Sequence, residues 1–351
     1  MPAQYTASIL VPATLDNGLA RGVRDVNIAG TGWTGTTNHA IYWFNGAPTD
    51  LNPTGFSFSA ANGVSDAFQV GGGHGSVTGN NDHALLWSGS AASVIDLNPT
   101  GFTTSWAYAV DGGSQVGTGK GSPTSQKTHA LLWSGSPSSA VDLNPTGYDE
   151  SEALAVSGSS QVGDAHSLSF GNVHAMLWNG TSGSALDLNP SGFTESWASG
   201  VSGSSQVGYG DGSGTDQNFH ALLWTGSAAS AVDLNPSGFD ESRAYAAADG
   251  YQVGAGLASD GNQHALLWTG SAASALDLQS ALTGLTFRGN SVTITSSYAT
   301  GVDSFGNVVG YGLDANLNEY ALLWSAPVPE PGAFAVLGIG ILALFGKARR
   351  R

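Results

Sequence analysis

A five-residue motif, His-Ala-Leu-Leu-Trp with close variants, returns seven times at nearly constant intervals along the chain. Its tryptophans are Trp43, Trp87, Trp133, Trp178, Trp224, Trp268 and Trp324. They are separated by 44, 46, 45, 46, 44 and 56 residues. Repetition at this period is typical of architectures in which each unit buries its apolar face against its neighbours. We therefore expect one array of seven similar units.

The composition favours short strands joined by tight turns. Glycine accounts for 51 of the 351 residues, which suits many turns. No segment before residue 332 combines the length and the 3.6-residue apolar period of a helix. Apolar residues make up 41% of the chain, enough for a sizeable core. The expected fold class is all-β.

Each unit divides into four apolar pieces separated by turn residues. In the third unit these are Trp106–Val110, Gln115–Gly117, His129–Trp133 and a piece that runs into Asp142-Leu-Asn-Pro145. Short runs bounded by Gly, Ser, Asn and Pro form antiparallel meanders, and a proline cannot continue a sheet ladder. Four short strands in about 45 residues predict the blade of a β-propeller.

The two ends of the array complement each other. Residues 7–11 match a fourth strand and residues 19–23 a first strand, whereas the array ends at Trp324 on a third strand. We expect residues 1–326 to form a seven-bladed β-propeller of four-stranded blades, in which the N-terminal strand closes the last blade. An insertion around residues 279–295 accounts for the long seventh unit. An open β-solenoid or a linear array is the alternative, but solenoid rungs are usually shorter, roughly 20–30 residues.

The charge balance narrows the class of partner. The formal net charge is −16, and four of the ten basic residues lie in the last five positions. So acidic a surface repels nucleic acid, and we expect no nucleic-acid binding. The chain has no cysteine, which excludes a disulfide framework and a Cys-ligated metal.

The repeated unit resembles the HAF family of extracellular repeats, which is named for a His-Ala-Phe core. Leu, Ile or Met replaces Phe in this chain, while His-Ala and Trp are kept in six of the seven units. The resemblance covers residues from about 7 to 325. It implies an extracellular repeat protein but no known activity.

Residues 327–351 form a separate segment. The motif Val328, Pro329, Glu330 and Pro331 precedes an apolar run over residues 332–346. A basic cluster, Lys347, Arg349, Arg350 and Arg351, ends the chain. This order resembles a PEP-CTERM sorting signal, also known as an ice-binding-protein C-terminal motif. The resemblance implies a bacterial protein that is exported, then recognised and cleaved by an exosortase-type sorting enzyme. It would lie at the cell-envelope membrane or, after processing, at the cell surface.

The apolar run 332–346 is predicted to be a short transmembrane helix. Basic residues after such a run stay on the cytoplasmic side, which places the propeller outside. The run is shorter than the roughly 20 residues of a typical span, and snorkelling by the basic side chains extends it. A core helix is the alternative, but no later segment exists to pack against it. Export also needs an N-terminal signal, which Met1–Tyr5 lacks, so we expect a start upstream or another route.

We expect no catalytic residue, no metal site and no cofactor. The motif histidines recur a whole blade apart, too far to share an ion bound near 2 Å, and a hydrogen bond to a loop explains their recurrence. Glu150, Glu195 and Glu241 also share one repeat position. Glycoside cleavage needs two carboxylates roughly 5–10 Å apart, which equivalent positions do not supply. The acidic, glycine-rich segment Asp211–Asp216 is expected to bind calcium only adventitiously.

One face of the propeller is the candidate binding face. The loops between second and third strands differ between units, and they emerge beside the connections from fourth to first strands. Variable loops on a rigid scaffold commonly bind partners, and aromatic rings beside hydroxyl groups suit sugar stacking. Filling the gaps between blades is the alternative role for these rings. The connections carry Phe56, Phe102, Tyr148, Phe193 and Phe239.

These observations predict a non-enzymatic surface protein that binds envelope polysaccharide or another extracellular partner. The alternative is a propeller enzyme that acts on extracellular polysaccharide, with a site that breaks the repeat near the central channel. Flat arrays of threonine, which an ice-binding surface would need, are absent from the sequence.

Overall fold

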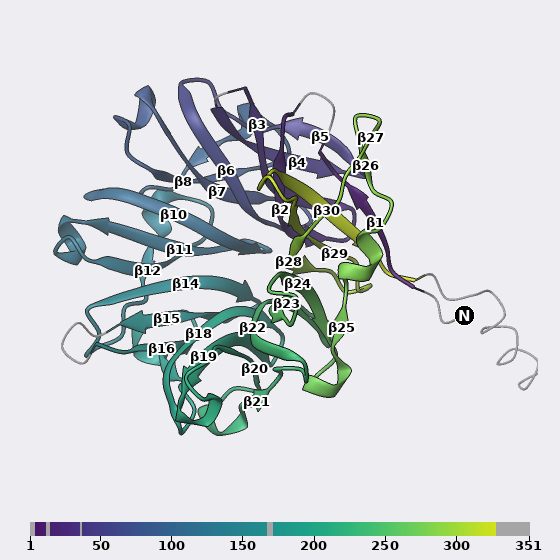
Figure 1. The fold of residues 1–351 in the computed structure, drawn as a ribbon. Helices are drawn as coiled ribbons and strands as arrows, with labels where there is room; N and C mark the ends of the chain where they lie inside the picture. Colours follow the sequence, from purple (N-terminus) through teal and green to yellow (C-terminus); the bar gives the residue numbers. More distant parts are fainter. Residues whose placement is uncertain (1–3, 12–14, 36, 167–170, 328–351) are drawn as a thin grey trace, which may run out of the picture.

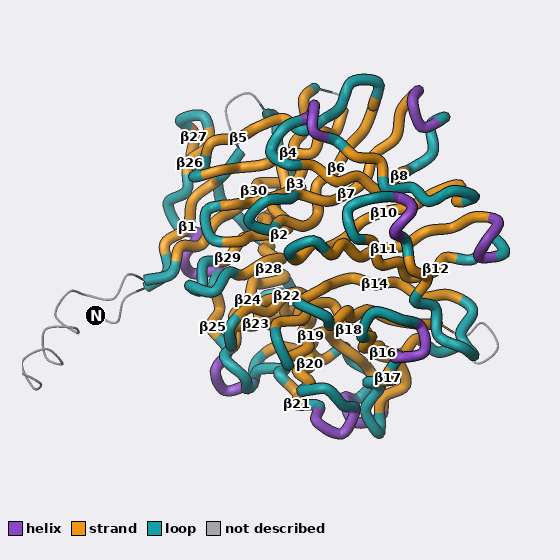
Figure 2. The backbone as a smooth tube through the Cα atoms, turned by 180° about the vertical axis from the view of Figure 1, so that it is seen from behind, coloured by secondary structure: helices purple, strands orange, loops and turns teal. Residues whose placement is uncertain are grey.

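The computed structural model describes residues 4–11, 15–35, 37–166 and 171–327. They form seven four-stranded antiparallel sheets arranged around a central axis, as the blades of a β-propeller (Figure 1). Figure 2 shows that helix is confined to short turns between the strands of the described residues. The predicted all-β, seven-bladed fold is confirmed.

Six blades are simple meanders in which the strands follow chain order from the inner edge outward. The first contains β2 (Gly18–Arg24), β3 (Asn27–Thr34), β4 (Thr37–Phe44) and β5 (Ala47–Asp50). The second contains β6 (Phe56–Val64), β7 (Gln69–Gly75), β8 (His83–Trp87) and β9 (Ile95–Asp96). The third contains β10 (Phe102–Asp111), β11 (Ser114–Gly121), β12 (Thr128–Trp133) and β13 (Val141–Asp142).

The fourth blade contains β14 (Glu150–Ser157), β15 (Ser160–His166), β16 (Val173–Trp178) and β17 (Leu186–Asp187). The fifth contains β18 (Phe193–Ser202), β19 (Ser205–Gly212), β20 (His220–Trp224) and β21 (Val232–Asp233). The sixth contains β22 (Phe239–Ala248), β23 (Tyr251–Ala258), β24 (Gln263–Trp268) and β25 (Leu276–Asp277). The seventh contains β28 (Ser296–Val302), β29 (Val308–Leu313), β30 (Glu319–Ser325) and the N-terminal β1 (Thr6–Ile9).

Short 3-10 helices follow many second and third strands. They are η1 (Ser76–Thr78), η2 (Ala91–Ser93), η3 (Ser122–Thr124), η4 (Pro137–Ser139), η5 (Ser182–Ser184), η6 (Ser213–Thr215), η7 (Ala228–Ser230), η8 (Ala272–Ser274) and η9 (Gln279–Leu282). The predicted insertion is confirmed, since η9 and a hairpin of β26 (Thr286–Phe287) and β27 (Asn290–Ser291) lie between the sixth and seventh blades in sequence.

The core is a ring of apolar layers between neighbouring blades. In one layer Val70 and Leu86 of the second blade pack with Ala107 and Trp133 of the third. All seven motif tryptophans are at most 1% exposed. A fully buried aromatic side chain is among the largest single contributions to a core, so the recurring motif supplies the layers that hold the ring together.

The N-terminal strand closes the ring as predicted. Strand β1 pairs with β30 in antiparallel register, Ala7 opposite Trp324. The Leu10 N–H donates to the Ala321 carbonyl oxygen at 2.8 Å, which repeats the bond from Leu51 to Ala40 in the first blade. Leu10 therefore takes the position of a fourth-strand leucine in the seventh blade.

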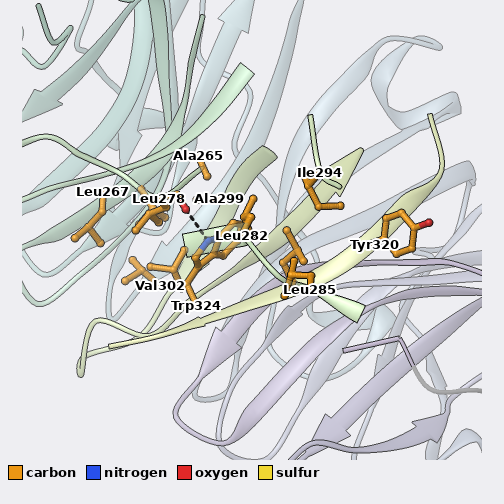
Figure 3. Packing of buried hydrophobic residues seen from close by; sticks show 13 residues of the cluster. Ala265, Leu267, Leu278, Leu282, Leu285, Ile294, Ala299, Val302, Tyr320 and Trp324 are labelled. Carbon is orange, nitrogen blue, oxygen red and sulfur yellow. Dashed lines mark hydrogen bonds between the residues drawn. The ribbon is translucent and has the colours of Figure 1, made fainter. Parts of the chain in front are cut away.

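The insertion enlarges the core of the seventh blade. Leu282 lies beside Trp324, and Leu285 and Ile294 extend the same apolar cluster toward Tyr320 (Figure 3). The Trp324 indole N–H donates to the Leu278 carbonyl oxygen at 3.2 Å. The extra residues of this unit thus cover the seventh blade, in which β1 pairs with β30, and shield its apolar side chains from solvent.

The predicted transmembrane helix over residues 332–346 and the basic cluster after it lie outside the described residues. Within the part that the structure describes, no helix is long and apolar enough to cross a membrane.

Candidate functional site

Each motif histidine forms a hydrogen bond with an aspartate of its own blade. In each of six blades, the His Nδ1 atom lies 2.7 Å from the Oδ2 atom of the aspartate on the fourth strand. The pairs are His39–Asp50, His83–Asp96, His129–Asp142, His174–Asp187, His220–Asp233 and His264–Asp277. Nowhere in the described ranges do three His, Asp or Glu side chains gather as metal ligands.

The same aspartates begin a hydrogen-bond chain that joins adjacent blades. Asp96 Oδ1 accepts the Asn98 N–H at 2.8 Å, and the Asn98 side-chain oxygen accepts the Ser105 hydroxyl at 2.7 Å. The Ser105 Oγ atom in turn accepts the Ala84 N–H at 3.0 Å. Ser105 belongs to the third blade and Ala84 to the second. The Ser-to-Ala link occurs at six of the seven boundaries between blades, so these recurring polar residues serve the scaffold.

The loops after second strands and the connections into first strands lie side by side, as predicted. The Ser76 hydroxyl donates to the Gly55 carbonyl oxygen at 3.4 Å, and Ser122 donates to Gly101 at 3.2 Å. We call this side of the ring the loop face. The opposite mouth of the channel has a cavity of about 460 Å³ among the turns that join first and second strands.

The five predicted aromatic residues lie on the loop face, but part of each ring is buried in contacts with its own blade. Each is half-buried against the apolar layer beside its own blade. The Tyr148 ring also meets His174 edge-on, and its hydroxyl donates to Asp187 Oδ2 at 3.3 Å. These contacts favour the gap-filling role. A binding role for Phe56, Phe102, Tyr148, Phe193 and Phe239 stays a prediction.

The repeat breaks where the inner strands line the channel. Each inner strand has a buried alanine, and the residue after it lies in the channel wall. In chain order these wall residues are Arg21, Asn62, Tyr108, Leu154, Ser199, Tyr245 and Thr300. The residues before the alanine vary as strongly: Leu19, Ala60, Trp106, Glu152, Trp197, Arg243 and Tyr298. A sevenfold scaffold therefore carries an asymmetric lining.

Beside this lining, aromatic rings gather on blades three, five and seven, on first and second strands and directly before a third strand. Trp197 stacks on Tyr209, with ring centroids 5.1 Å apart, and Phe219 meets both rings edge-on. The Arg243 guanidinium lies 4.4 Å from the Phe219 ring centroid and 5.5 Å from that of Tyr209. In the seventh blade Tyr298 and Tyr311 stack at 4.7 Å. We call Trp106, Trp197, Tyr209, Phe219, Arg243, Tyr298 and Tyr311 the aromatic arc.

Two carboxyl groups stand beside the arc. Glu152 on β14 lies directly opposite Asp164 on β15 in the strand register. Burial raises the pKa of Glu152, and the neighbouring Glu150 raises it further. Burial also raises the pKa of Asp164 well above its usual value, with a further contribution from Glu152. Perturbed pKa values at a cavity are typical of functional sites.

A cavity of about 340 Å³ adjoins this pair. Its lining includes Trp106, Tyr108, Lys120 and Glu152, together with threonine hydroxyl groups. The pKa of Tyr108 is raised to about 12, mainly by burial and then by the charge of Glu152. The Tyr108 hydroxyl therefore stays protonated and can donate a hydrogen bond over the physiological range.

The pair Glu152–Asp164 was not predicted from the sequence. Only Glu150, Glu195 and Glu241, which occupy equivalent positions, were considered there. Those three lie on three different blades. A signal was present: only the fourth unit has acids at both of these paired positions. The corresponding pairs are Leu19–Thr31, Ala60–Gly72, Trp106–Thr118, Trp197–Tyr209, Arg243–Ala255 and Tyr298–Tyr311.

The segment expected to bind calcium adventitiously, Asp211–Asp216, forms the end of β19 and η6. Asp211 Oδ1 is buried and has no hydrogen-bond partner among the described residues. Calcium binding here stays a prediction.

The comparison with protein-family models identifies the end of the chain. A model of the PEP-CTERM protein-sorting motif matches residues 327–351. The predicted sorting motif is confirmed, and it implies a bacterial exported protein that is recognised by exosortase-type machinery and is membrane-anchored or at the surface. A search of curated proteins gave no significant match.

Solved structures share the fold of the ring. The β-propeller domain of the Trilobed protease from Pyrococcus furiosus is 9% identical, with a TM-score of 0.58 and coverage of 89% of this chain and 94% of that one. A puromycin hydrolase mutant complexed with PGG is 11% identical, with a TM-score of 0.60, over 92% of this chain and 57% of that one. A puromycin-hydrolyzing peptidase of Mycobacterium tuberculosis is 14% identical, with a TM-score of 0.52, over 86% of this chain and 51% of that one. The chain thus spans little more than half the length of these two hydrolases.

This likeness corrects the expectation that the chain is not an enzyme. Solved structures that resemble it include those of a protease and of puromycin-hydrolysing enzymes, at 9–14% identity. At such identity the likeness shows the fold alone. A repetitive propeller scaffold is therefore no ground for excluding catalysis.

Proposed function

We propose that this chain is an exported, surface-displayed propeller of the HAF-repeat type that binds an extracellular polysaccharide through the aromatic arc. The single observation that carries the proposal is the asymmetric set of aromatic and charged groups beside the channel. Tyr209 and Phe219 of the fifth blade contact Arg243 of the sixth, and Tyr298 stacks on Tyr311 in the seventh, although the scaffold around them repeats. Binding residues typically depart from the symmetry of a rigid scaffold that presents them.

The chemistry of the arc fits a carbohydrate. Aromatic faces pack against the apolar C–H faces of sugar rings, while neighbouring hydroxyl and charged groups fix orientation by hydrogen bonding. The net charge of −16 disfavours a polyanion such as nucleic acid and leaves neutral polymers as suitable partners. The sorting motif supports a position in the envelope, where such polymers occur.

The five predicted aromatic residues of the loop face extend this proposal outward. They lie on the loop face, each against the apolar layer beside its own blade. Their exposed edges would contact polymer segments that leave the arc, while their buried edges support the blade layers. We assign the larger share of the binding energy to the arc, because interface energy concentrates in a few well-packed aromatic and Arg residues.

A glycan array probed with the full-length chain tests this proposal. We expect retention of at least one polysaccharide, and a loss of about tenfold or more in affinity for Trp197→Ala. Phe305→Ala is the control, because this aromatic side chain is 67% exposed in the turn between β28 and β29 and takes part in none of the ring contacts of the arc. Equal binding by wild type and Trp197→Ala, with both folded, would overturn the proposal. Release of new reducing ends would instead identify the alternative, a polysaccharide-cleaving enzyme.

A further inference from the structure

The cavity beside Glu152 is lined by residues of the second, third and fourth blades and combines several kinds of group. It lies between Trp106 of the third blade and Glu152 of the fourth, and Thr104, Thr118 and Lys120 add hydroxyl and ammonium groups. A polar cavity with one indole face and several hydrogen-bonding groups has the composition of a small-ligand site.

Residues of the neighbouring second blade hold the Trp106 ring in place. Gly72 lies beneath the indole, and a Cβ atom at that position would overlap the Trp106 ring. The Phe58 ring supports the indole from the second blade, with centroids 6.3 Å apart. The absence of a side chain at Gly72 therefore lets the ring lie flat beside the cavity.

The two carboxyl groups are available to a partner. Glu152 and Asp164 are partly exposed, and neither is among the buried polar groups that lack access to a partner. Their oxygen atoms can therefore hydrogen-bond to water or to a ligand in the cavity. The hydroxyl groups of a sugar supply both donors and acceptors, so they match a carboxyl pair that keeps a proton.

We propose that Trp106 and Glu152, with Asp164 behind Glu152, form a subsite for one neutral sugar residue of the bound polymer. This inference rests on the proposed function and names the substrate class: a neutral polysaccharide with neighbouring hydroxyl groups. An acidic sugar would place its carboxylate against Glu152 and Asp164, and like charges at that distance repel.

The charged surroundings define how the subsite responds to pH. Glu150 on the same strand and Asp164 on the next face Glu152, and Tyr108 and Tyr209 lie on the flanking blades. Asp82 and Lys120 are in the cavity wall, and only Lys120 is cationic. Binding should therefore weaken as pH rises through the raised carboxyl pKa values and the pair loses its proton.

The test uses the full-length chain with dextran, a neutral polymer, and carboxymethyl dextran, its acidic derivative, as probes. We expect wild type to bind dextran more tightly at about pH 5 than at about pH 9. Glu152→Gln should retain binding at the higher pH, because its amide cannot lose a proton. Trp106→Ala should bind about tenfold more weakly at both values. Glu195→Gln, the same chemical change on the first strand of the next blade at the position equivalent to Glu150, should behave as wild type.

The outcomes separate the two proposals. If Trp197→Ala weakens dextran binding but Trp106→Ala and Glu152→Gln leave its strength and pH dependence unchanged, the arc binds sugar and the subsite inference is overturned. Stronger retention of carboxymethyl dextran than of dextran overturns it as well. If no array glycan and neither dextran is retained by the wild type, the proposed function itself fails.

Discussion

Carboxyl groups in this ring experience opposite environments according to where the repeat places them. Asp260 lies on an exposed loop, and its pKa is lowered because the Asn262 N–H and side chain donate to it. Asp164, on the second strand of a blade, has its pKa raised by burial and by Glu152. A group whose pKa is raised on folding holds its proton more strongly in the folded state, so the folded state is favoured at low pH.

We predict that Asp164→Asn stabilises the propeller at neutral pH. The contribution of Asp164 is fully present below the ordinary carboxyl pKa and is lost as pH rises toward its raised value. Asparagine removes this loss, so the free energy of unfolding near pH 7 should rise by about 1 kcal/mol. Urea unfolding at several pH values measures it. The exposed Asp240→Asn serves as control, and a steeper fall of stability with pH in Asp164→Asn would contradict the prediction.

At the level of the strands, hydrogen bonds between neighbouring blades add to the apolar packing that holds the ring together. Six of the seven inner strands contribute a serine that is buried at the boundary with the preceding blade, as in Ser105 between Asn98 and the Ala84 N–H. The apolar layers provide most of the burial, but the serine sets the register between two blades. Removing it leaves two buried polar groups without a partner.

Ser105→Ala should therefore cost about 1–3 kcal/mol of unfolding free energy. The Ala84 N–H and the Asn98 side-chain oxygen lose their partner, while the apolar layer stays intact. Thr103→Ala on the same strand is exposed and should change stability by no more than about 0.5 kcal/mol. Chemical denaturation compares the two variants, and similar effects of both would show that the serine link is dispensable.

The strands of the ring could be predicted because turn residues and the Trp motif recur at every unit. The pairing of Glu152 with Asp164 could not, because it depends on the register of β14 and β15 and on the irregularity between Ala153 and Ala155. The aromatic residues of the loop face were predicted in the connections from fourth to first strands; the four Phe residues begin first strands, and Tyr148 lies in the connection itself. Their degree of burial follows from packing between blades, which a single unit does not reveal. For the channel, the sequence predicted only that a functional site would break the repeat there; it did not predict which residues line the wall.

The closing strand carries a prediction of its own. Deleting residues 1–11 removes β1, exposes the edge of β30 and takes away the Leu10 carbonyl oxygen that accepts the Trp43 indole N–H at 3.2 Å. We expect a loss of several kcal/mol and a tendency to associate through the open edge. Deletion of residues 1–4 alone, which spares β1, is the control. Thermal unfolding and light scattering report both effects, and equal stability of the two deletions would argue that closure contributes little.

At the scale of the whole molecule, closure brings the two ends of the described chain together. Strand β1 is hydrogen-bonded to β30, and Pro327, two residues after β30, lines a cavity of about 520 Å³ with Gln4 and Tyr5 (Figure 1). The described chain therefore ends at the seventh blade, where the match to the sorting motif begins.

We predict that removal of residues 328–351 changes the location of the protein but not the stability of the ring. The sorting motif lies within 327–351, whereas the closing contacts of β1 with β30 all precede Pro327. The truncated chain should be lost from the envelope fraction and keep the wild-type melting temperature within about 2 °C. The double variant Pro329→Ala and Pro331→Ala is the sharper comparison, because it alters the motif and leaves the apolar run and basic cluster in place. Envelope retention of both variants, at wild-type level and with the same processing, would show that the segment does not sort this protein.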